Sequence, residues 1–211
     1  MQLKTFTFNP FQENSYLLYD ETKECVLIDA GCLFPQEEQA LRQFISDNQL
    51  QVKHLLNTHL HIDHAFGNAF VANTYGVLPQ AHADDEFLVG TMHQQAQLFG
   101  INYPFHTQSI GKYLNEGDTV TFGNTTLDVL HVPGHSPGSL CFYEPEAKAL
   151  IAGDVLFSGS IGRTDLPGGN YNTLIRGIQK KLLTLPPETI VYCGHGPTTT
   201  IGEEKQYNPY L

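Results

Sequence analysis

Positive charge is scarce in this chain. Only 11 Lys and Arg stand against 22 Asp and Glu, so the formal net charge at pH 7 is −11. A surface that follows a phosphate backbone needs clustered basic residues, which this composition does not supply. The sequence therefore argues against a nucleic-acid partner.

Long apolar runs are also missing. No uncharged stretch has the length needed to cross a bilayer, and the N-terminal residues 1–6 do not combine a basic segment with an apolar run. We therefore expect no membrane partner and a cytoplasmic location.

Cysteine is sparse, with four residues and no C-x-x-C pair. In a chain without an export signal, Cys25, Cys32, Cys141 and Cys193 are expected to be reduced thiols that fill the core. Neither a disulfide framework nor a cysteine-based zinc site is predicted.

The remaining composition fits one folded unit. With 41% hydrophobic residues in 211 and no linker rich in Pro, Gly or Ser, the chain is expected to form a single domain over residues 1–211. Short apolar runs alternate with amphipathic stretches, which predicts layers of strands and helices. Strands are expected at 5–9, 15–19, 24–29, 52–57, 78–82, 119–122, 125–132, 140–143, 149–152 and 189–193. Helices are expected at 35–48, 65–75, 84–98 and 171–183.

Residues 99–112 have aromatic residues and turn formers but no clear period. They are expected to form a surface loop, which either covers a substrate or is an ordinary packed connection.

Four possible metal ligands crowd into the six residues 59–64, just after the predicted strand 52–57. His59 and His61 are two apart in an extended segment and therefore point the same way, whereas Asp63 and His64 project from the first turn of a helix. Two ligand pairs could thus face two neighbouring metal ions. The alternative is that Asp63 only caps the helix.

The same pattern recurs at three later strand ends. His135 follows strand 125–132 in a Pro/Gly turn, Asp154 follows strand 149–152, and His195 lies between two glycines after strand 189–193. Together with the first stretch this gives five histidines and two carboxylates, which suits two adjacent divalent ions bridged by one carboxylate. Zinc is the first choice, and iron or manganese also suit imidazole and carboxylate. Because a structural zinc site closes with four ligands, this larger set predicts metal-assisted hydrolysis.

The sequence resembles the metallo-β-lactamase superfamily. The resemblance is carried by Thr58-His59-Leu60-His61-Ile62-Asp63-His64, Gly134-His135, Gly153-Asp154 and Gly194-His195, and spans nearly the whole chain. It implies an α/β (α+β) fold, the four-layer αββα sandwich. It also implies one metal on His59, His61 and His135, a second on Asp63, His64 and His195, and Asp154 as the bridge. Asp29 matches the family's early aspartate, which orients a ligand histidine, although it could equally be a turn carboxylate.

Within this superfamily the chain looks like the glyoxalase II (hydroxyacylglutathione hydrolase) group, and more narrowly like its short, YcbL-type members. The segments 133–139, 160–169 and 194–204 carry that likeness. It implies a small-molecule thioester substrate such as S-D-lactoylglutathione, attacked by a hydroxide that bridges the metals, with Asp63 positioning or deprotonating the water. Arg163 is the candidate substrate anchor because an arginine fork suits a carboxylate. Its alternative is a structural ion pair with Asp165.

Other functions fit the same fold. The alternatives are a persulfide dioxygenase with a single iron, a lactonase, a true β-lactamase and a non-catalytic binding protein. Metal content and oxygen consumption distinguish the dioxygenase from the hydrolases.

Overall fold

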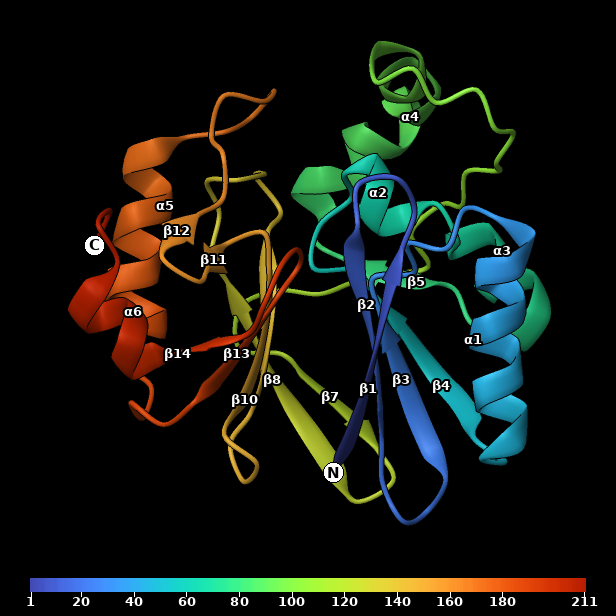
Figure 1. Cartoon of the computed structure of the whole chain (residues 1–211), viewed down its shortest axis with the longest axis horizontal. Coiled ribbons are helices and arrows are strands. Elements are labelled where there is room, and N and C mark those ends of the chain that lie inside the picture. Colours follow the sequence, from blue (N-terminus) through green and yellow to red (C-terminus); the bar gives the residue numbers. More distant parts are fainter.

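The computed structural model describes all residues, 1–211. Two six-stranded sheets face each other, and helices cover their outer faces (Figure 1). The first sheet runs β1-β2-β3-β4-β5-β6, formed by Gln2–Phe8, Glu13–Tyr19, Glu24–Ile28, Gln51–Leu56, Pro79–Ala81 and Lys112–Tyr113. The second runs β14-β13-β10-β9-β8-β7, formed by Thr199–Thr200, Ile190–Cys193, Ala149–Gly153, Leu140–Glu144, Thr125–His131 and Thr119–Phe122. A small hairpin, β11 (Leu156–Phe157) and β12 (Ser160–Ile161), stands apart.

Helices α1 (Pro35–Asp47) and α3 (Asn68–Tyr75) belong to the outer layer on the first sheet. Pro35 is the first residue of α1, where its missing N–H costs nothing. Helix α3 ends at Gly76, whose φ of 72° is the left-handed conformation expected there. Leu41 and Ile45 of α1 pack with buried residues of the sheet, which fixes this layer.

The second sheet is covered by α5 (Tyr171–Gly177), its π-helical continuation η2 (Ile178–Leu182) and α6 (Ile201–Tyr207). Leu174, Ile178 and Leu182 are buried with the apolar side chains of that sheet. Side chains thus fill both faces of each sheet, which explains why the strands read as continuous apolar runs.

A third buried cluster lies between the sheets. Along β2, Tyr16 and Leu18 point into it, whereas Leu17 points to the helix layer, as the two-residue period of a strand requires. Phe142 and Ile151 complete the cluster from the second sheet. The four-layer αββα prediction is confirmed.

The ends of β4, β8, β10 and β13 meet at one edge of the two sheets, the upper edge in Figure 1. Strands β10 and β13 are parallel, and β8 runs parallel to them because β9 is antiparallel to both β8 and β10. Helices α2 (Ile62–Ala65) and α4 (Glu86–Leu98), with the short 3-10 turn η1 (Ala83–Asp85), flank this edge.

Most predicted elements are present within one to three residues. The predicted strand 189–193 corresponds to β13. The turn after His195 then leads into two further elements, β14 and α6, which were not predicted. The predicted helix 171–183 is one continuous stretch that changes to π geometry after Gly177. Residues 99–111 carry no helix or strand, as expected.

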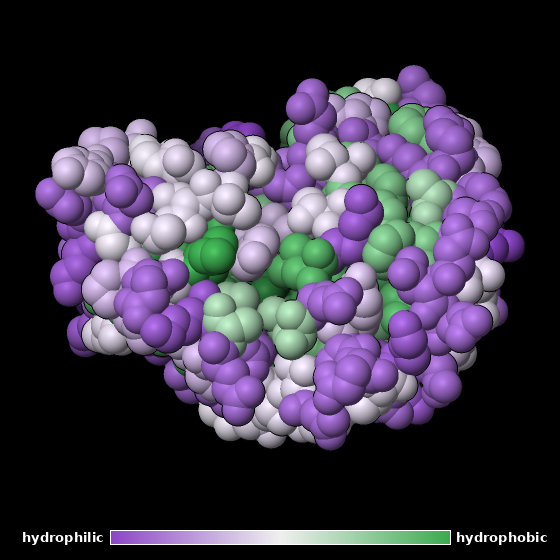
Figure 2. All heavy atoms as spheres, turned by 60° about the horizontal axis from the view of Figure 1, so that its bottom comes forward, coloured by the Kyte–Doolittle hydropathy of each residue, from purple (hydrophilic) through white to green (hydrophobic).

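All four cysteines are buried free thiols, as predicted. None of the helices has the length and apolarity that crossing a membrane requires. On the face that Figure 2 shows, hydrophilic residues form most of the periphery and hydrophobic residues gather in patches nearer the middle.

Candidate metal centre

The first ligand stretch leaves β4 in an extended conformation and enters α2 at Ile62. Leu60 and Ile62 turn into the core, which leaves His59 and His61 on the opposite side. Asp63 lies in the first turn of α2, as predicted, but its Oδ2 is 3.2 Å from His195 Nε2. The carboxylate is therefore directed into the site rather than used as a helix cap.

Three imidazoles converge in a first cluster. His61 Nδ1 lies 2.9 Å from His135 Nε2, which lies 3.2 Å from His59 Nε2. Nitrogens that share one tetrahedral ion at about 2.1 Å are roughly 3.4 Å from one another. The spacing of this cluster is close to what one divalent ion requires.

A second cluster lies beside the first. His64 Nε2 and His195 Nε2 are 3.3 Å apart, and Asp63 Oδ2 is 3.2 Å from His195 Nε2 and 3.8 Å from His64 Nε2. Two nitrogens and one carboxylate oxygen thus converge on a second position.

Asp154 lies between the two clusters. Its Oδ2 is 3.6 Å from both His135 Nε2 and His195 Nε2, and its Oδ1 is 3.4 Å from His64 Nε2. Oδ1 is buried without a hydrogen-bond partner, which is costly unless something else satisfies it. A side chain at Gly194 would come within 2.1 Å of this oxygen, so glycine is required there.

The protonation pattern of these residues also suits metal ions. His135 Nδ1 is 2.8 Å from the Arg163 carbonyl and His195 Nδ1 is 3.1 Å from the Phe11 carbonyl. A carbonyl only accepts, so each Nδ1 carries the proton and a neutral ring leaves a lone pair on Nε2. Burial lowers the pKa of His61 to about 3, which keeps this ring neutral.

The carboxylates of the site are ionised. Burial alone would raise the pKa of Asp154, but the surrounding histidines, His64 above all, outweigh burial and hold that pKa below its ordinary value. The pKa of Asp63 is also lowered, because His64 and His195 outweigh its burial. Burial alone would lower the pKa values of His64 and His195, but Asp154 and Asp63 raise both, so a bound ion would take the place of a proton on each of these rings. Imidazole nitrogens and carboxylate oxygens are the donors that divalent ions bind, so the seven predicted ligands fit two such ions.

Asp29 holds two of the histidines. Its Oδ2 lies 3.0 Å from His64 Nδ1 and accepts a 2.6 Å hydrogen bond from the Thr58 hydroxyl, whose oxygen is 3.1 Å from His59 Nδ1. Asp29 therefore orients His64 directly and His59 through Thr58, as the first of its two interpretations expected. Its φ of 55°, unusual for a residue other than glycine, brings the carboxylate to this position.

Asp85 was not predicted. Its fully buried carboxylate accepts hydrogen bonds from Leu60 N at 3.2 Å, from Ser136 Oγ at 2.8 Å and from Gly138 N at 2.6 Å. Leu60 stands between His59 and His61, and Ser136 follows His135, so Asp85 ties together the two loops that supply the first cluster. In the sequence it is one of two adjacent acids before a helix, a pattern that indicates only a helix start.

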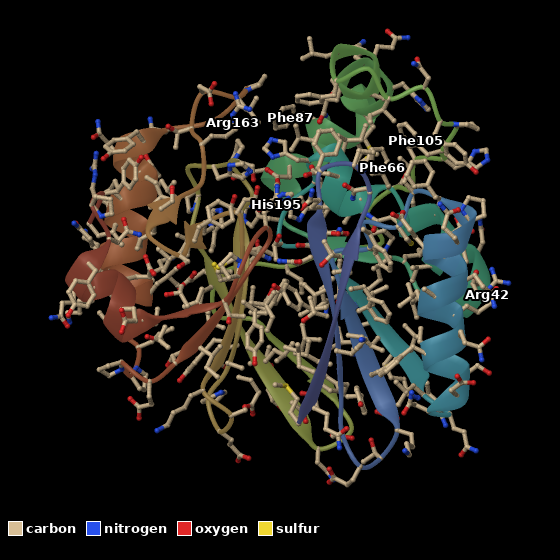
Figure 3. All side chains as sticks on the ribbon, in the orientation of Figure 1. Arg42, Phe66, Phe87, Phe105, Arg163 and His195 are labelled. Carbon is tan, nitrogen blue, oxygen red and sulfur yellow. The ribbon has the colours of Figure 1, made fainter.

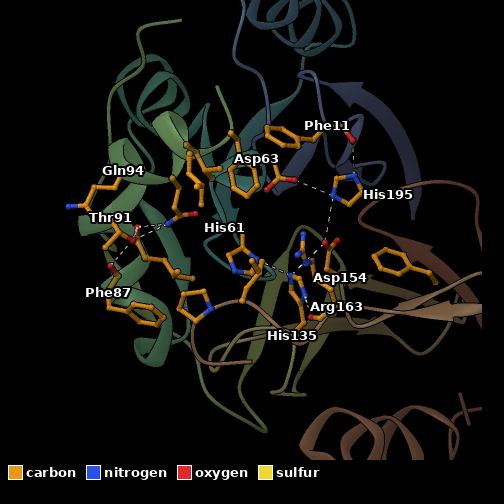
Figure 4. A pocket seen from close by; sticks show the side chains of 18 residues that line it. Phe11, His61, Asp63, Phe87, Thr91, Gln94, His135, Asp154, Arg163 and His195 are labelled. Carbon is orange, nitrogen blue, oxygen red and sulfur yellow. Dashed lines mark hydrogen bonds and ion pairs between the residues drawn. The ribbon is translucent and has the colours of Figure 1, made fainter. Parts of the chain in front are cut away.

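The position of Arg163 is compatible with both predicted roles, a substrate anchor and an ion pair with Asp165. Its side chain lines the pocket above the clusters, and its Nε and Nη2 donate to Asp165 at 2.8 and 2.7 Å (Figure 4). Phe99, the first residue of the 99–112 segment, also lines this pocket, whose volume is about 680 Å³. The end of that segment nearest α4 therefore forms part of a pocket wall.

Known proteins agree with this geometry. The family model described as the metallo-beta-lactamase superfamily matches residues 8–195. The hydroxyacylglutathione hydrolase GloC of Haemophilus influenzae is 38% identical over 100% of this chain and 98% of its own length. The crystal structure of the BLEG-1 B3 metallo-beta-lactamase has a TM-score of 0.89 and 36% identity, covering 100% of this chain and 99% of that one.

A further similar structure is TTHA1623 in a di-iron-bound form, with a TM-score of 0.87 and 38% identity over 99% of this chain and 100% of that one. The fold, the family match and these relatives lead to the same conclusion. This chain belongs to the metallo-β-lactamase superfamily.

Proposed function

We propose that this protein is a dinuclear metallohydrolase that cleaves thioesters, with S-D-lactoylglutathione or a related hydroxyacyl thioester as substrate. The observation that carries the proposal is the position of Asp154 between two complete ligand clusters. A carboxylate so placed could be shared by two ions, one held by each cluster. The likeness to GloC, a hydroxyacylglutathione hydrolase, supports the thioester over other substrates.

When bound, two divalent ions would supply Lewis acidity and lower the pKa of a water to about 7. We assign the first to His59, His61 and His135, the second to Asp63, His64 and His195, and the bridge to Asp154. Zinc remains the first choice, with iron or manganese as alternatives.

Asp63 has a role beyond binding. Its side chain lines the pocket and is 15% exposed, whereas that of His64 is fully buried. Its ionised carboxylate can therefore orient an incoming water and accept its proton.

The leaving group needs no strong acid. A thiol has a pKa of about 8.5, so a thiolate departs without the protonation that an amine requires. Arg163, at the pocket, is proposed to contact the polar end of the substrate, because its exposed ion pair with Asp165 is weak enough to exchange.

Elemental analysis of the purified protein, combined with hydrolysis of S-D-lactoylglutathione, tests the proposal. Two metal ions per chain and turnover that is lost on chelation and restored by metal are the expected results. Full metal occupancy without cleavage of any thioester would rule out the function.

A β-lactam is a second candidate substrate, favoured by the likeness to BLEG-1. Hydrolysis of a chromogenic cephalosporin, compared with thioester hydrolysis by the same preparation, decides between them. One iron per chain with oxygen uptake on glutathione persulfide would instead identify the dioxygenase.

A further inference from the structure

The pocket above the metal-ligand clusters has a mainly apolar wall. Helix α4 contributes Phe87, Leu88 and Leu98 on one side, and Phe11, Phe157 and Leu166 approach from other segments (Figure 4). In the view of Figure 3, Phe87 and Arg163 lie above His195. Phe87 and Leu98 are 45% and 79% exposed, so large apolar surface faces the opening.

Of the three polar α4 side chains that line the pocket, Thr91 and Gln95 are already hydrogen-bonded, whereas Gln94 is not. Thr91 Oγ donates to the Leu88 carbonyl at 3.1 Å, and Gln95 Nε2 lies 3.0 Å from Thr91 Oγ and 3.3 Å from the same carbonyl. These groups satisfy one another within the helix. They leave few donors for a ligand on this side of the pocket.

Cationic side chains are almost absent from the wall. Arg163 is the only Lys or Arg that lines the pocket, and Asp165 already neutralises it through two hydrogen bonds. A peptide carrier with two free carboxylates would find a single exchangeable cation, in a protein of net charge −11. An apolar group would find a continuous surface.

We infer that the substrate carries an extended apolar group, an alkyl or aryl portion of its acyl or thiol part, which packs against Phe87 and Leu98 of α4. This specificity rests on the proposed thioester hydrolysis and, within it, favours a related thioester with an apolar group over S-D-lactoylglutathione, which has no such group. The pocket volume of about 680 Å³ is in the range of sites for drug-sized ligands and far exceeds what a lactoyl group fills.

Binding of thioethers, which cannot be hydrolysed, tests the inference separately from catalysis. S-Methyl to S-octyl derivatives of N-acetylcysteamine would be titrated into the metal-loaded protein by calorimetry. Because each buried methylene favours binding, the affinity is expected to rise about two- to fourfold per carbon until the wall is covered. S-Hexylglutathione is expected to bind no more tightly than S-hexyl-N-acetylcysteamine.

A variant in the pocket wall and a control variant elsewhere test where the apolar group binds. Phe87→Ala removes part of the wall at an exposed position and is expected to weaken S-octyl binding about tenfold, with little change for S-methyl. Tyr207→Ala removes a comparably exposed aromatic ring on α6, away from the pocket, and should change neither.

Affinity that does not depend on chain length, or a clear preference for the glutathione derivative, would overturn the inference. Thioester hydrolysis followed in parallel keeps the two proposals distinguishable. A chain-length dependence without cleavage rejects the thioesterase, whereas cleavage without that dependence rejects only the apolar specificity.

Discussion

Asp154 is the residue that lies between the two clusters of predicted metal ligands. Histidines of both clusters lie within 3.6 Å of its carboxylate, and one of its oxygens is buried without a partner. Asp154→Asn keeps the shape but removes the negative charge that both ion positions share. We expect at least one metal ion to be lost per chain and hydrolysis to fall about 100-fold or more.

Elemental analysis and steady-state rates measure that outcome. Asp47→Asn is the matched control, because Asp47 is exposed on α1 and is not among the seven predicted ligands. A variant of Asp154 with two ions and full activity would contradict the bridging assignment.

Asp85 gives a prediction about positioning. Asp85→Asn removes the charged acceptor for Leu60, Ser136 and Gly138 while preserving the size of the side chain. The loops that carry His59, His61 and His135 are expected to loosen, with metal affinity reduced about 10- to 100-fold. Competition with a chelator measures the affinity, and circular dichroism checks that the fold is kept. Unchanged metal affinity would mean that Asp85 stabilises the fold but does not position the metal ligands.

The two aspartates also show which individual residues of the site can be predicted from the sequence. Asp154 could be predicted because it follows an apolar strand beside a glycine, as His135 and His195 do. Asp85 could not, because its partners Leu60 and Ser136 lie 25 and 51 residues away along the chain and use only backbone and hydroxyl groups.

Among the elements, two distant turns are joined by Asp20. This buried carboxylate accepts hydrogen bonds from Thr22 N at 2.9 Å and Asn124 N at 2.7 Å, and so connects the β2–β3 turn to the β7–β8 turn. Burial alone would raise its pKa, but the hydrogen bonds from Thr22, Asn124 and Thr125 lower it. An acid whose pKa is depressed on folding stabilises the fold above its unfolded pKa of about 3.9.

Asp20→Asn is therefore expected to reduce the free energy of unfolding by about 2 kcal/mol at pH 7. The difference from the parent protein should shrink as the pH falls below about 4, where the carboxylate becomes protonated in the unfolded chain and then in the folded protein. Urea unfolding of the metal-free protein at pH 7 and pH 3.5 measures both values. An equal difference at the two pH values would exclude an electrostatic cause.

Elements were predicted well wherever a helical period or a short apolar run was visible. Helix α1 follows from a helical apolar pattern, and strand β4 and the hairpin of β9 and β10 follow from short apolar runs. The two-residue strands β11, β12 and β14 were not predicted. Their pairing is imposed by neighbouring turns, so their sequences have no period to detect. Helix α6 was missed because its seven residues follow directly on such a strand.

For the whole molecule, the ligand set spans both sheets. His59, His61, Asp63 and His64 follow β4 of the first sheet, whereas His135, Asp154 and His195 follow strands of the second. Metal ions bound at this edge would therefore stabilise the packing of one sheet on the other. At a free metal concentration 100 times the dissociation constant, mass action favours the folded state by about 2.7 kcal/mol.

In a protein of this size, that free energy corresponds to a rise in Tm of roughly 5–10 °C. Scanning calorimetry of the protein with and without zinc provides the measurement. The variant His64→Ala, which lacks one ligand of the second cluster, should show a smaller rise. Equal Tm values with and without metal would mean that the ions do not link the sheets.

The division of ligands between the sheets has a genetic consequence. The first sheet is built from residues before Leu114 and the second from residues after it, and the segment 99–111 between α4 and β6 has no helix or strand. A gene cut within that segment would encode two polypeptides, each with an incomplete set of ligands for either ion. Co-expression of the two pieces should then restore hydrolysis only in medium that supplies the metal, which would make the protein a metal-dependent complementation reporter.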